Sequence, residues 1–218
     1  MAGRGDRAGL AGLLGPQAVV PLVEVDDDAR AVALARVLVD NGLPVMEVAL
    51  RTPGAMSALL AVQSAVPDAV VGVGTVLSLE QLSVALDAGA AFVVSPGSGD
   101  ELLNAALNCP VPYVPGVATA TELMRTVAAG IREVKVFPAE TMGGVGAVAA
   151  FATVAPSVRF LPTGGIDERS ALGYLLLESV LAVGGSWVCP RALIHEESWD
   201  VIGPLALAAS KLTRSDPA

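Results

Sequence analysis

Lys135 lies within an apolar run at residues 133–137, between Val134 and Val136. The chain has only one other lysine, Lys211, near a polar C-terminus. A lone ammonium is costly to bury unless it is paired or neutralised. Burial favours the neutral form of an amine, and a neutral amine can attack a carbonyl carbon. Lys135 is therefore a candidate nucleophile; the structural alternative is a strand-end lysine that reaches solvent or binds a carboxylate.

Polar side chains also interrupt two other apolar runs. Glu47 and Arg51 share one face if their run is a β-strand, and Thr75 lies near the end of the next run. No histidine lies near these strand ends, so Glu47 is the candidate for proton transfer, and Arg51 can bind a carboxylate through two parallel hydrogen bonds. The structural alternatives are a buried Glu47–Arg51 ion pair and a Thr75 hydroxyl bonded to the backbone.

Two glycine pairs follow the last two apolar runs, as TGG at 163–165 and GGS at 184–186. Glycine lets backbone N–H groups approach an anion closely. One such pair is common in tight turns, but two at corresponding positions predict a phosphate site.

The elements that must position these residues form a regular alternation. Each apolar run is followed by an amphipathic stretch, which indicates strand and helix in turn. The first such stretch opens with three aspartates at 26–28, suited to an N-cap, and ends with Asn41-Gly42, a C-cap pattern. The predicted strands are 19–25, 45–50, 70–76, 91–95, 113–117, 133–137, 159–162 and 180–183, and the later helices are 54–66, 78–88, 99–108, 119–129, 144–155, 167–177 and 199–211.

Eight strand–helix alternations predict an α/β fold of the (β/α)8 TIM-barrel type in a single domain. A doubly wound open sheet is the alternative, but no G-x-G-x-x-G follows the first strand. We assign the barrel to residues 19–212, an N-terminal segment or helix that caps it to 1–18, and a polar C-terminal tail to 213–218.

The active site of such a barrel lies at the C-terminal ends of the strands, and the alternation of a strand decides which side chains meet there. Glu133 shares a face with Lys135 but should lie deeper or at the opposite end, so we assign it a structural role. The side chains that we expect to point into the barrel are Glu47, Arg51, Val71, Val73, Thr75, Lys135 and Phe137.

Composition excludes several classes of function. The net charge is −9 and no basic run is present, so nucleic acid is not expected as a partner. The uncharged stretch at 141–158 contains glycines and a proline, and we do not expect it to span a membrane. Cys109 and Cys189 match no metal or redox spacing and indicate reduced thiols in the cytoplasm, while the single histidine, His195, lies in an acidic segment away from the predicted site. We therefore expect no metal; the composition argues against zinc, and a Mg²⁺ ion held by carboxylates is the alternative that stays open.

The chain resembles the 2-keto-3-deoxy-6-phosphogluconate (KDPG)/4-hydroxy-2-oxoglutarate (KHG) aldolase family. The resemblance runs in order over nearly the whole predicted barrel. It is carried by EVALRT at 47–52, GVGTV at 72–76, VSPG at 94–97, VPGV at 114–117, KVFPAE at 135–140, PTGG at 162–165 and GGSW at 184–187.

The resemblance implies a cofactor-free, Schiff-base (class I) aldolase of the Entner–Doudoroff type, usually a homotrimer. Lys135 matches the Schiff-base lysine of the family, and Glu47 matches its general acid/base. Arg51 and Thr75 match the ligands of the pyruvate carboxylate, and Pro96 matches a residue that lines the pocket. Further residues that match the family's substrate-binding positions are Phe137, Thr163, Gly164, Gly165, Gly184, Gly185 and Ser186.

Such an enzyme would cleave a 2-keto-3-deoxy sugar acid phosphate to pyruvate and glyceraldehyde 3-phosphate. Three alternatives remain open from the sequence. The substrate could be 4-hydroxy-2-oxoglutarate or the galactonate epimer of the phosphorylated sugar acid. The same barrel could instead be a phosphosugar isomerase with Glu47 as its base, or a phospho-ligand-binding protein without catalytic activity.

Overall fold

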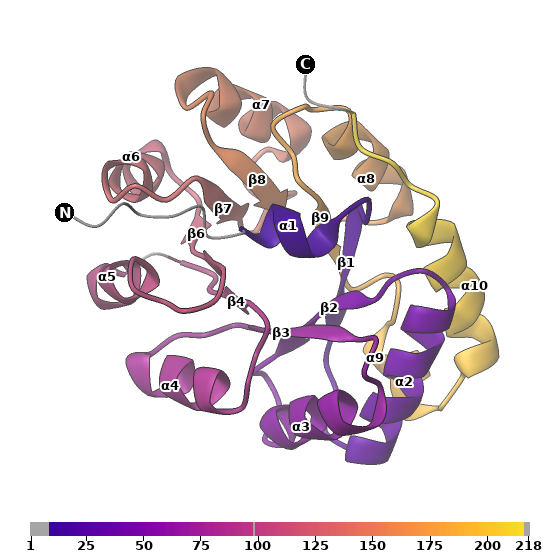
Figure 1. Ribbon diagram of the computed structural model, residues 1–218. Coiled ribbons are helices and arrows are strands. Elements are labelled where there is room, and N and C mark those ends of the chain that lie inside the picture. Colours follow the sequence, from indigo (N-terminus) through magenta and orange to yellow (C-terminus); the bar gives the residue numbers. More distant parts are fainter. Residues whose placement is uncertain (1–8, 98, 216–218) are drawn as a thin grey trace.

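The computed structural model describes residues 9–97 and 99–215 of the chain. Figure 1 shows parallel strands gathered at the centre and helices arranged around them. The parts of the predicted N-terminal segment and C-terminal tail that fall on 1–8 and 216–218 lie outside the described residues. The strands are β1 (Val19–Val23), β2 (Val45–Ala49), β3 (Val70–Gly74), β4 (Val93–Val94), β5 (Tyr113–Val114), β6 (Gly116–Val117), β7 (Glu133–Val136), β8 (Arg159–Pro162) and β9 (Val183–Gly185).

The strands close into a ring. One run of paired strands has the order β5-β4-β3-β2-β1-β9 and another has the order β6-β7-β8. Bridges from Phe160 to Val180 and from Thr163 to Gly184 join β8 to the last strand segment. β5 and β6 are two parts of one predicted strand, separated by Pro115, which has no N–H to donate to a ladder. The ring is the predicted barrel.

Four of the helices that cover the barrel begin at side-chain caps. The side chains of Asp27, Ser78, Thr119 and Asp167 each accept a hydrogen bond from a backbone N–H in the first turn of the helix that follows. The helices are α1 (Leu10–Leu14), α2 (Asp28–Asp40), α3 (Ala55–Ala65), α4 (Leu79–Asp87), α5 (Asp100–Ala106), α6 (Ala120–Ala128), α7 (Gly144–Val154), α8 (Glu168–Leu175), α9 (Arg191–His195) and α10 (Trp199–Ser210).

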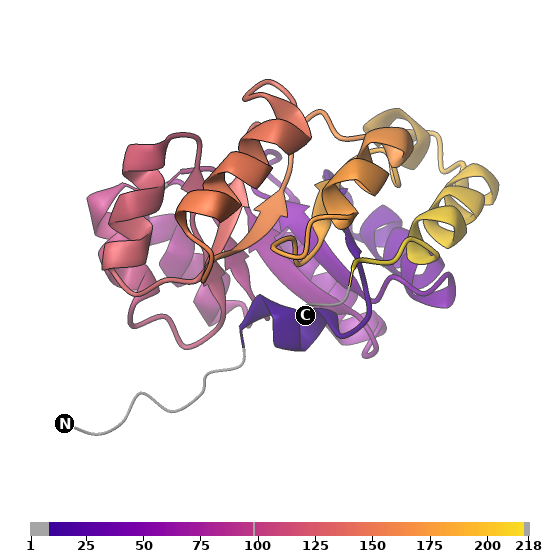
Figure 2. The same ribbon diagram turned by 90° about the horizontal axis from the view of Figure 1, so that it is seen from above.

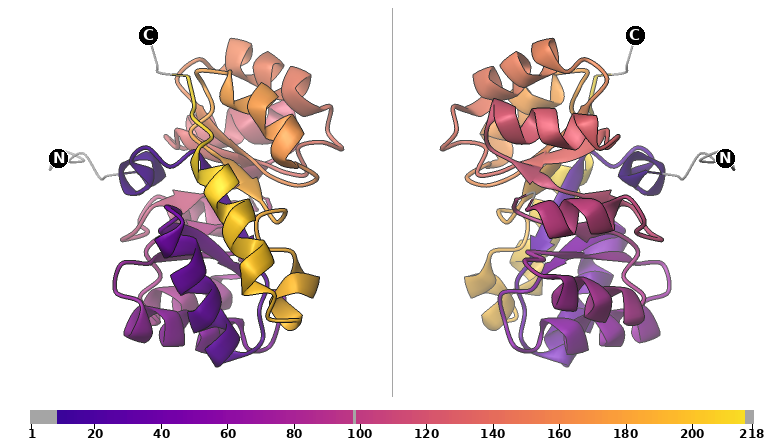
Figure 3. Two further views of the ribbon diagram at one scale, coloured as in Figure 1. Left: turned by 90° about the vertical axis from the view of Figure 1, so that its right-hand side faces the viewer. Right: turned by 90° about the vertical axis from the view of Figure 1, so that its left-hand side faces the viewer.

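The short helix α9 was not predicted, because five residues are too few for a helical periodicity to stand out. Beyond it, α10 runs alongside α2, so the last helix of the chain packs beside the first helix of the ring (Figure 3). No helix in the described part of the chain combines the length and the hydropathy needed to cross a membrane.

Apolar side chains form two packed layers. Met46 and Val48 of β2 and Val134 and Val136 of β7 belong to the layer between the strands and the helices, as strand alternation predicted. The second layer fills the inside of the barrel with side chains such as Val20, Phe92, Val114 and Leu161, and Leu10 and Leu14 of α1 pack against it.

The helix α1 lies across the N-terminal end of the strands (Figure 2). Glu133, at the start of β7, accepts hydrogen bonds from the backbone N–H groups of Leu10 at 2.6 Å and Ala11 at 3.1 Å. A carboxylate at a helix N-terminus satisfies N–H groups that lack a partner within the helix and complements the helix dipole. The structural role predicted for Glu133 is confirmed.

The predicted orientation of the third strand was wrong. Val71 and Val73 of β3 pack in the layer that faces the helices, not inside the barrel. The inner face of β3 carries Val70, Gly72 and Gly74, and an added Cβ at the two glycines would collide with the side chains of Phe92 and Glu47. Thr75 follows β3 with a left-handed backbone, at a φ of 63°, so strand alternation does not extend to it.

Candidate active site

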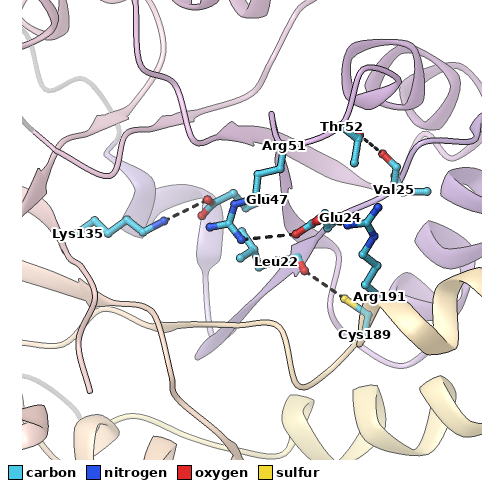
Figure 4. Close-up of polar contacts among 9 residues, drawn as sticks. All are labelled: Leu22, Glu24, Val25, Glu47, Arg51, Thr52, Lys135, Cys189 and Arg191. Carbon is cyan, nitrogen blue, oxygen red and sulfur yellow. Dashed lines mark hydrogen bonds and ion pairs between the residues drawn. The ribbon is translucent and has the colours of Figure 1, made fainter. Parts of the chain in front are cut away.

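Lys135 and Glu47 form a buried pair inside the barrel (Figure 4). The Nζ atom of Lys135 lies 3.3 Å from Oε1 of Glu47, and the two side chains are 3% and 1% exposed. Nζ also lies 5.4 Å from the centre of the Phe137 ring, whose face attracts a cation. The sequence predicted that these side chains would point inward and meet, and the structure brings them together.

The second oxygen of the carboxylate, Oε2 of Glu47, is buried and has no hydrogen-bond partner among the described residues. Gly74 leaves the space that the Glu47 side chain occupies, because a Cβ at this position would overlap the carboxylate. A buried carboxylate with an unsatisfied oxygen beside an amine can exchange protons with a bound molecule.

A pocket of about 310 Å³ opens at the C-terminal ends of the strands. Arg51 enters it from the end of β2 and Phe137 from the end of β7, two residues beyond Lys135. The Lys135–Glu47 pair therefore lies one layer deeper in the barrel than Arg51 and Phe137, which line the pocket. The full lining is Leu22, Arg51, Phe137, Pro138, Thr141, Thr163, Gly164, Gly165, Ile166, Gly184 and Ser186.

Arg51 pairs with Glu24, not with Glu47 as one sequence alternative proposed. Its Nη1 lies 3.6 Å from Oε2 of Glu24, which follows β1. The side chain of Arg51 donates no hydrogen bond to any described residue, and it is 38% exposed. The guanidinium is therefore available to an anion in the pocket.

The first glycine pair forms a loop that no other residue could adopt without strain. Gly164 and Gly165 have φ values of 101° and 79°, and a Cβ on either would press on Phe137 or Glu140. Glu140 supports the loop, because its backbone N–H donates to the carbonyl of Gly164 at 3.1 Å. The buried Tyr174 hydroxyl donates to Glu140 Oε1 at 2.8 Å, and burial together with this carboxylate raises the pKa of Tyr174.

The arrangement can support imine chemistry: a buried amine, a carboxylate beside it, an available guanidinium and a glycine loop at the rim. The family model described as "KDPG and KHG aldolase" matches residues 13–205. The chain belongs to the KDPG and KHG aldolase family.

Individual relatives agree with this assignment. The KHG/KDPG aldolase of Escherichia coli K12 is 44% identical over 191 residues, which are 88% of this chain and 90% of the relative. A KDPG aldolase from Legionella pneumophila, solved with pyruvate captured as a covalent carbinolamine intermediate, superposes with a TM-score of 0.89 at 38% identity and covers 92% of this chain and 98% of its own. The aldolase of Zymomonas mobilis ZM4, solved with 3-phosphoglycerate, has a TM-score of 0.86 at 41% identity. The match covers 95% of this chain and 98% of the Zymomonas chain.

Some predicted site residues of this aldolase lie outside the pocket lining. Pro96 is half-buried and its backbone closely approaches Gly116, while Thr75 is half-buried next to Gly74. Gly185 faces Trp187, with which an added Cβ would collide. Their roles in binding stay predictions.

Sequence reasoning missed several residues of this aldolase at the pocket and its rim. Thr141 lies one residue beyond KVFPAE and contributes a hydroxyl to the lining. Glu24 is the only charged residue in the predicted first strand, and that isolated charge near a strand end was the signal that could have identified it.

The remaining candidates of the sequence are structural or peripheral. His195 is exposed, and its Nε2 lies 3.9 Å from Oδ2 of Asp26. Cys109 and Cys189 are buried thiols, and burial raises the pKa of Cys189 to about 12. Among residues 9–97 and 99–215, no group of three histidine, cysteine or acidic side chains is placed to hold a metal ion.

Proposed function

We propose that the protein is a class I aldolase that cleaves KDPG to pyruvate and glyceraldehyde 3-phosphate, and 4-hydroxy-2-oxoglutarate to pyruvate and glyoxylate. The observation that carries this proposal is the buried contact of 3.3 Å between Lys135 Nζ and Glu47 Oε1 beneath a pocket lined by Arg51. The carbinolamine in the Legionella relative supports the same chemistry.

The first step forms the covalent intermediate. The neutral amine of Lys135 attacks the C2 ketone of the substrate, and loss of water from the carbinolamine gives an iminium ion. Glu47 Oε1 is close enough to accept the proton that the amine must lose before it attacks. Arg51 binds the substrate carboxylate through its free donors and so fixes the ketone relative to Nζ.

The second step breaks the carbon–carbon bond. Glu47, directly or through a water molecule, removes the proton of the C4 hydroxyl, the C3–C4 bond breaks, and its electrons enter the iminium to give an enamine and the free aldehyde. Glu47 then returns a proton to C3 of the enamine. Hydrolysis of the resulting imine releases pyruvate and regenerates Lys135.

Further residues position the two ends of the substrate. Thr75 assists Arg51 at the carboxylate, and Pro96 and Phe137 form the apolar wall beside the pyruvyl group. The aldehyde fragment and its phosphate bind at the rim, where backbone N–H groups of a glycine loop suit an anion. The residues assigned to this end are Thr163, Gly164, Gly165, Gly184, Gly185 and Ser186.

The direct test is to incubate the protein with pyruvate and sodium borohydride and to measure its intact mass, followed by peptide mapping. One reduced pyruvate on the peptide that bears Lys135 is expected. The absence of an adduct on folded protein would exclude a Schiff-base mechanism and favour the isomerase or binding-protein alternative.

The physiological substrate follows from kinetics rather than from trapping. We expect kcat/KM to be higher for the two phosphorylated substrates, KDPG and its galactonate epimer, than for 4-hydroxy-2-oxoglutarate, because the predicted rim site suits a phosphate. A higher kcat/KM for 4-hydroxy-2-oxoglutarate would reassign the main activity.

We also propose that the enzyme is a cytoplasmic homotrimer. Several large apolar side chains are more than half exposed in the single chain, and association would remove them from water. Multi-angle light scattering should give three times the mass of 21.9 kDa. The most exposed of these side chains are Leu77, Met124, Val154 and Leu176.

A further inference from the structure

Glu24 lies between two arginines at the rim of the pocket (Figure 4). Its Oε1 accepts a hydrogen bond from Nη1 of Arg191 at 2.9 Å. Its Oε2 lies 3.6 Å from Nη1 of Arg51, which is beyond hydrogen-bonding distance. The same carboxylate therefore accepts a hydrogen bond from Arg191 but is only at ion-pair distance from Arg51.

This asymmetry matters because Arg51 is the arginine that lines the pocket. A carboxylate and a guanidinium frequently form a bidentate pair with two parallel hydrogen bonds. Such a pair between Glu24 and Arg51 would occupy the donors that the carboxylate of a ligand requires. Glu24 is thus a potential internal competitor of the substrate.

Arg191 is in a position to prevent this competition. It is the first residue of α9, at the end of the segment that follows β9, and it approaches Glu24 from the side opposite Arg51 (Figure 4). The segment is anchored to β1 nearby, where Cys189 Sγ contacts the carbonyl oxygen of Leu22 at 3.5 Å. The arginine is therefore held beside the end of β1, where Glu24 lies.

We propose that Arg191 is a positioning residue that draws the carboxylate of Glu24 away from Arg51 and so leaves Arg51 free to bind the carboxylate of the ligand. This inference rests on the proposed function, in which Arg51 binds pyruvate. It assigns Arg191 no contact with the substrate. Glu24 should therefore lower the affinity of Arg51 for the carboxylate of the ligand, and Arg191 should raise it.

The test uses three variants: Arg191→Gln, Glu24→Gln and the double variant. In Arg191→Gln, Glu24 turns to Arg51, and the pyruvate concentration that gives half-maximal borohydride adduct should rise about fivefold, in line with an exposed ion pair. In Glu24→Gln, this half-maximal pyruvate concentration should stay at or below the wild-type value. In the double variant, the competing carboxylate of Glu24 is absent, so the half-maximal concentration should equal that of Glu24→Gln. The kcat for cleavage should be unchanged in all three.

A matched control is Arg30→Gln, which removes the arginine from another exposed arginine–glutamate pair, Arg30–Glu197. If Arg191→Gln has the same half-maximal pyruvate concentration as Arg30→Gln, the inference is wrong. If the double variant stays as weak as Arg191→Gln, then Arg191 contacts the ligand itself and the inference is also wrong. If even the wild-type protein forms no adduct, the proposed function fails as well, an outcome separate from the other two.

Discussion

Lys135 Nζ and Glu47 Oε1 lie 3.3 Å apart, although the two residues are 88 positions apart in the chain. They belong to β7 and β2, which are not paired in the barrel, so the contact crosses its interior. Removing one partner of such a buried pair leaves an uncompensated charge and costs about 3–5 kcal/mol. Variants at either position therefore need a measurement of folding beside the measurement of activity.

Lys135→Ala should abolish both cleavage and the borohydride-trapped adduct, because no other lysine lies in the interior of the part of the barrel that the structure describes. The matched control is Lys211→Ala, which removes the only other lysine at an exposed position and should leave both signals intact. Intact mass and pyruvate release are the measurements. Trapped pyruvate that persists in folded Lys135→Ala would place the Schiff base on another group.

Glu47→Gln should reduce kcat by about 100-fold or more, because it removes the proposed general acid/base. The carboxamide keeps the shape of the side chain, so some imine should still form. Single-turnover trapping and steady-state kinetics separate the two effects, and thermal unfolding reports on folding. A normal kcat would remove Glu47 from its proposed role.

Gly74→Ala should reduce kcat with little change in the overall fold, because the new Cβ would displace the Glu47 carboxylate from Lys135. Gly146→Ala is the matched control: its Cβ would meet nothing within 4 Å, and it lies in α7, where alanine should stabilise the helix by about 0.5–1 kcal/mol. Equal loss of activity in both variants would contradict the steric explanation.

Ser186→Ala should raise KM for phosphorylated substrates severalfold and leave KM for 4-hydroxy-2-oxoglutarate nearly unchanged. The reason is that Ser186 lines the pocket beside Gly184, at the end to which we assign the phosphate. Comparing the two substrates in one preparation is the internal control. An unchanged KM for KDPG would move the phosphate to another part of the rim.

The buried thiol of Cys189 should make the stability of the protein depend on pH. Burial raises its pKa from the ordinary value near 9 to about 12, so the unfolded chain loses the thiol proton at lower pH than the folded chain. The contribution of the buried, protonated thiol to the free energy of unfolding is fully present below about pH 9 and is lost as the pH rises toward 12. Between pH 8 and pH 10, wild-type protein should lose about 1–2 kcal/mol more in free energy of unfolding than Cys189→Ala, as measured by urea unfolding. Equal losses would contradict this linkage.

The barrel could be predicted because its signals are local and repeated. Each apolar run and each capping aspartate, serine or threonine acts within a few residues, and nearly all of them gave the observed element. The last strand was predicted too early in the chain, at 180–183, whereas β9 spans Val183–Gly185. A continuous apolar run does not show at which residue strand pairing begins. The orientation of β3 was missed because its inward positions next to Phe92 and Glu47 are the glycines Gly72 and Gly74, not polar residues.

The site was predictable where residue type and strand alternation agree, as for Lys135, Glu47 and Arg51. It was not predictable where tertiary contacts decide. Whether Arg51 pairs with Glu47 or with Glu24 depends on how β1 and β2 lie side by side, which no local pattern states. The position of Thr75 likewise depends on a left-handed backbone after Gly74.

The helix α1 has a consequence for the order of events in the reaction cycle. It covers one end of the barrel, so exchange with solvent takes place through the pocket at the other end. In the proposed geometry, the pyruvyl group is tied to Lys135 below and the aldehyde fragment lies above it, toward the mouth. The aldehyde must then depart before pyruvate, and in the reverse direction pyruvate must enter first. The covalent intermediate already imposes this order, and the closed end of the barrel imposes the same order for a steric reason.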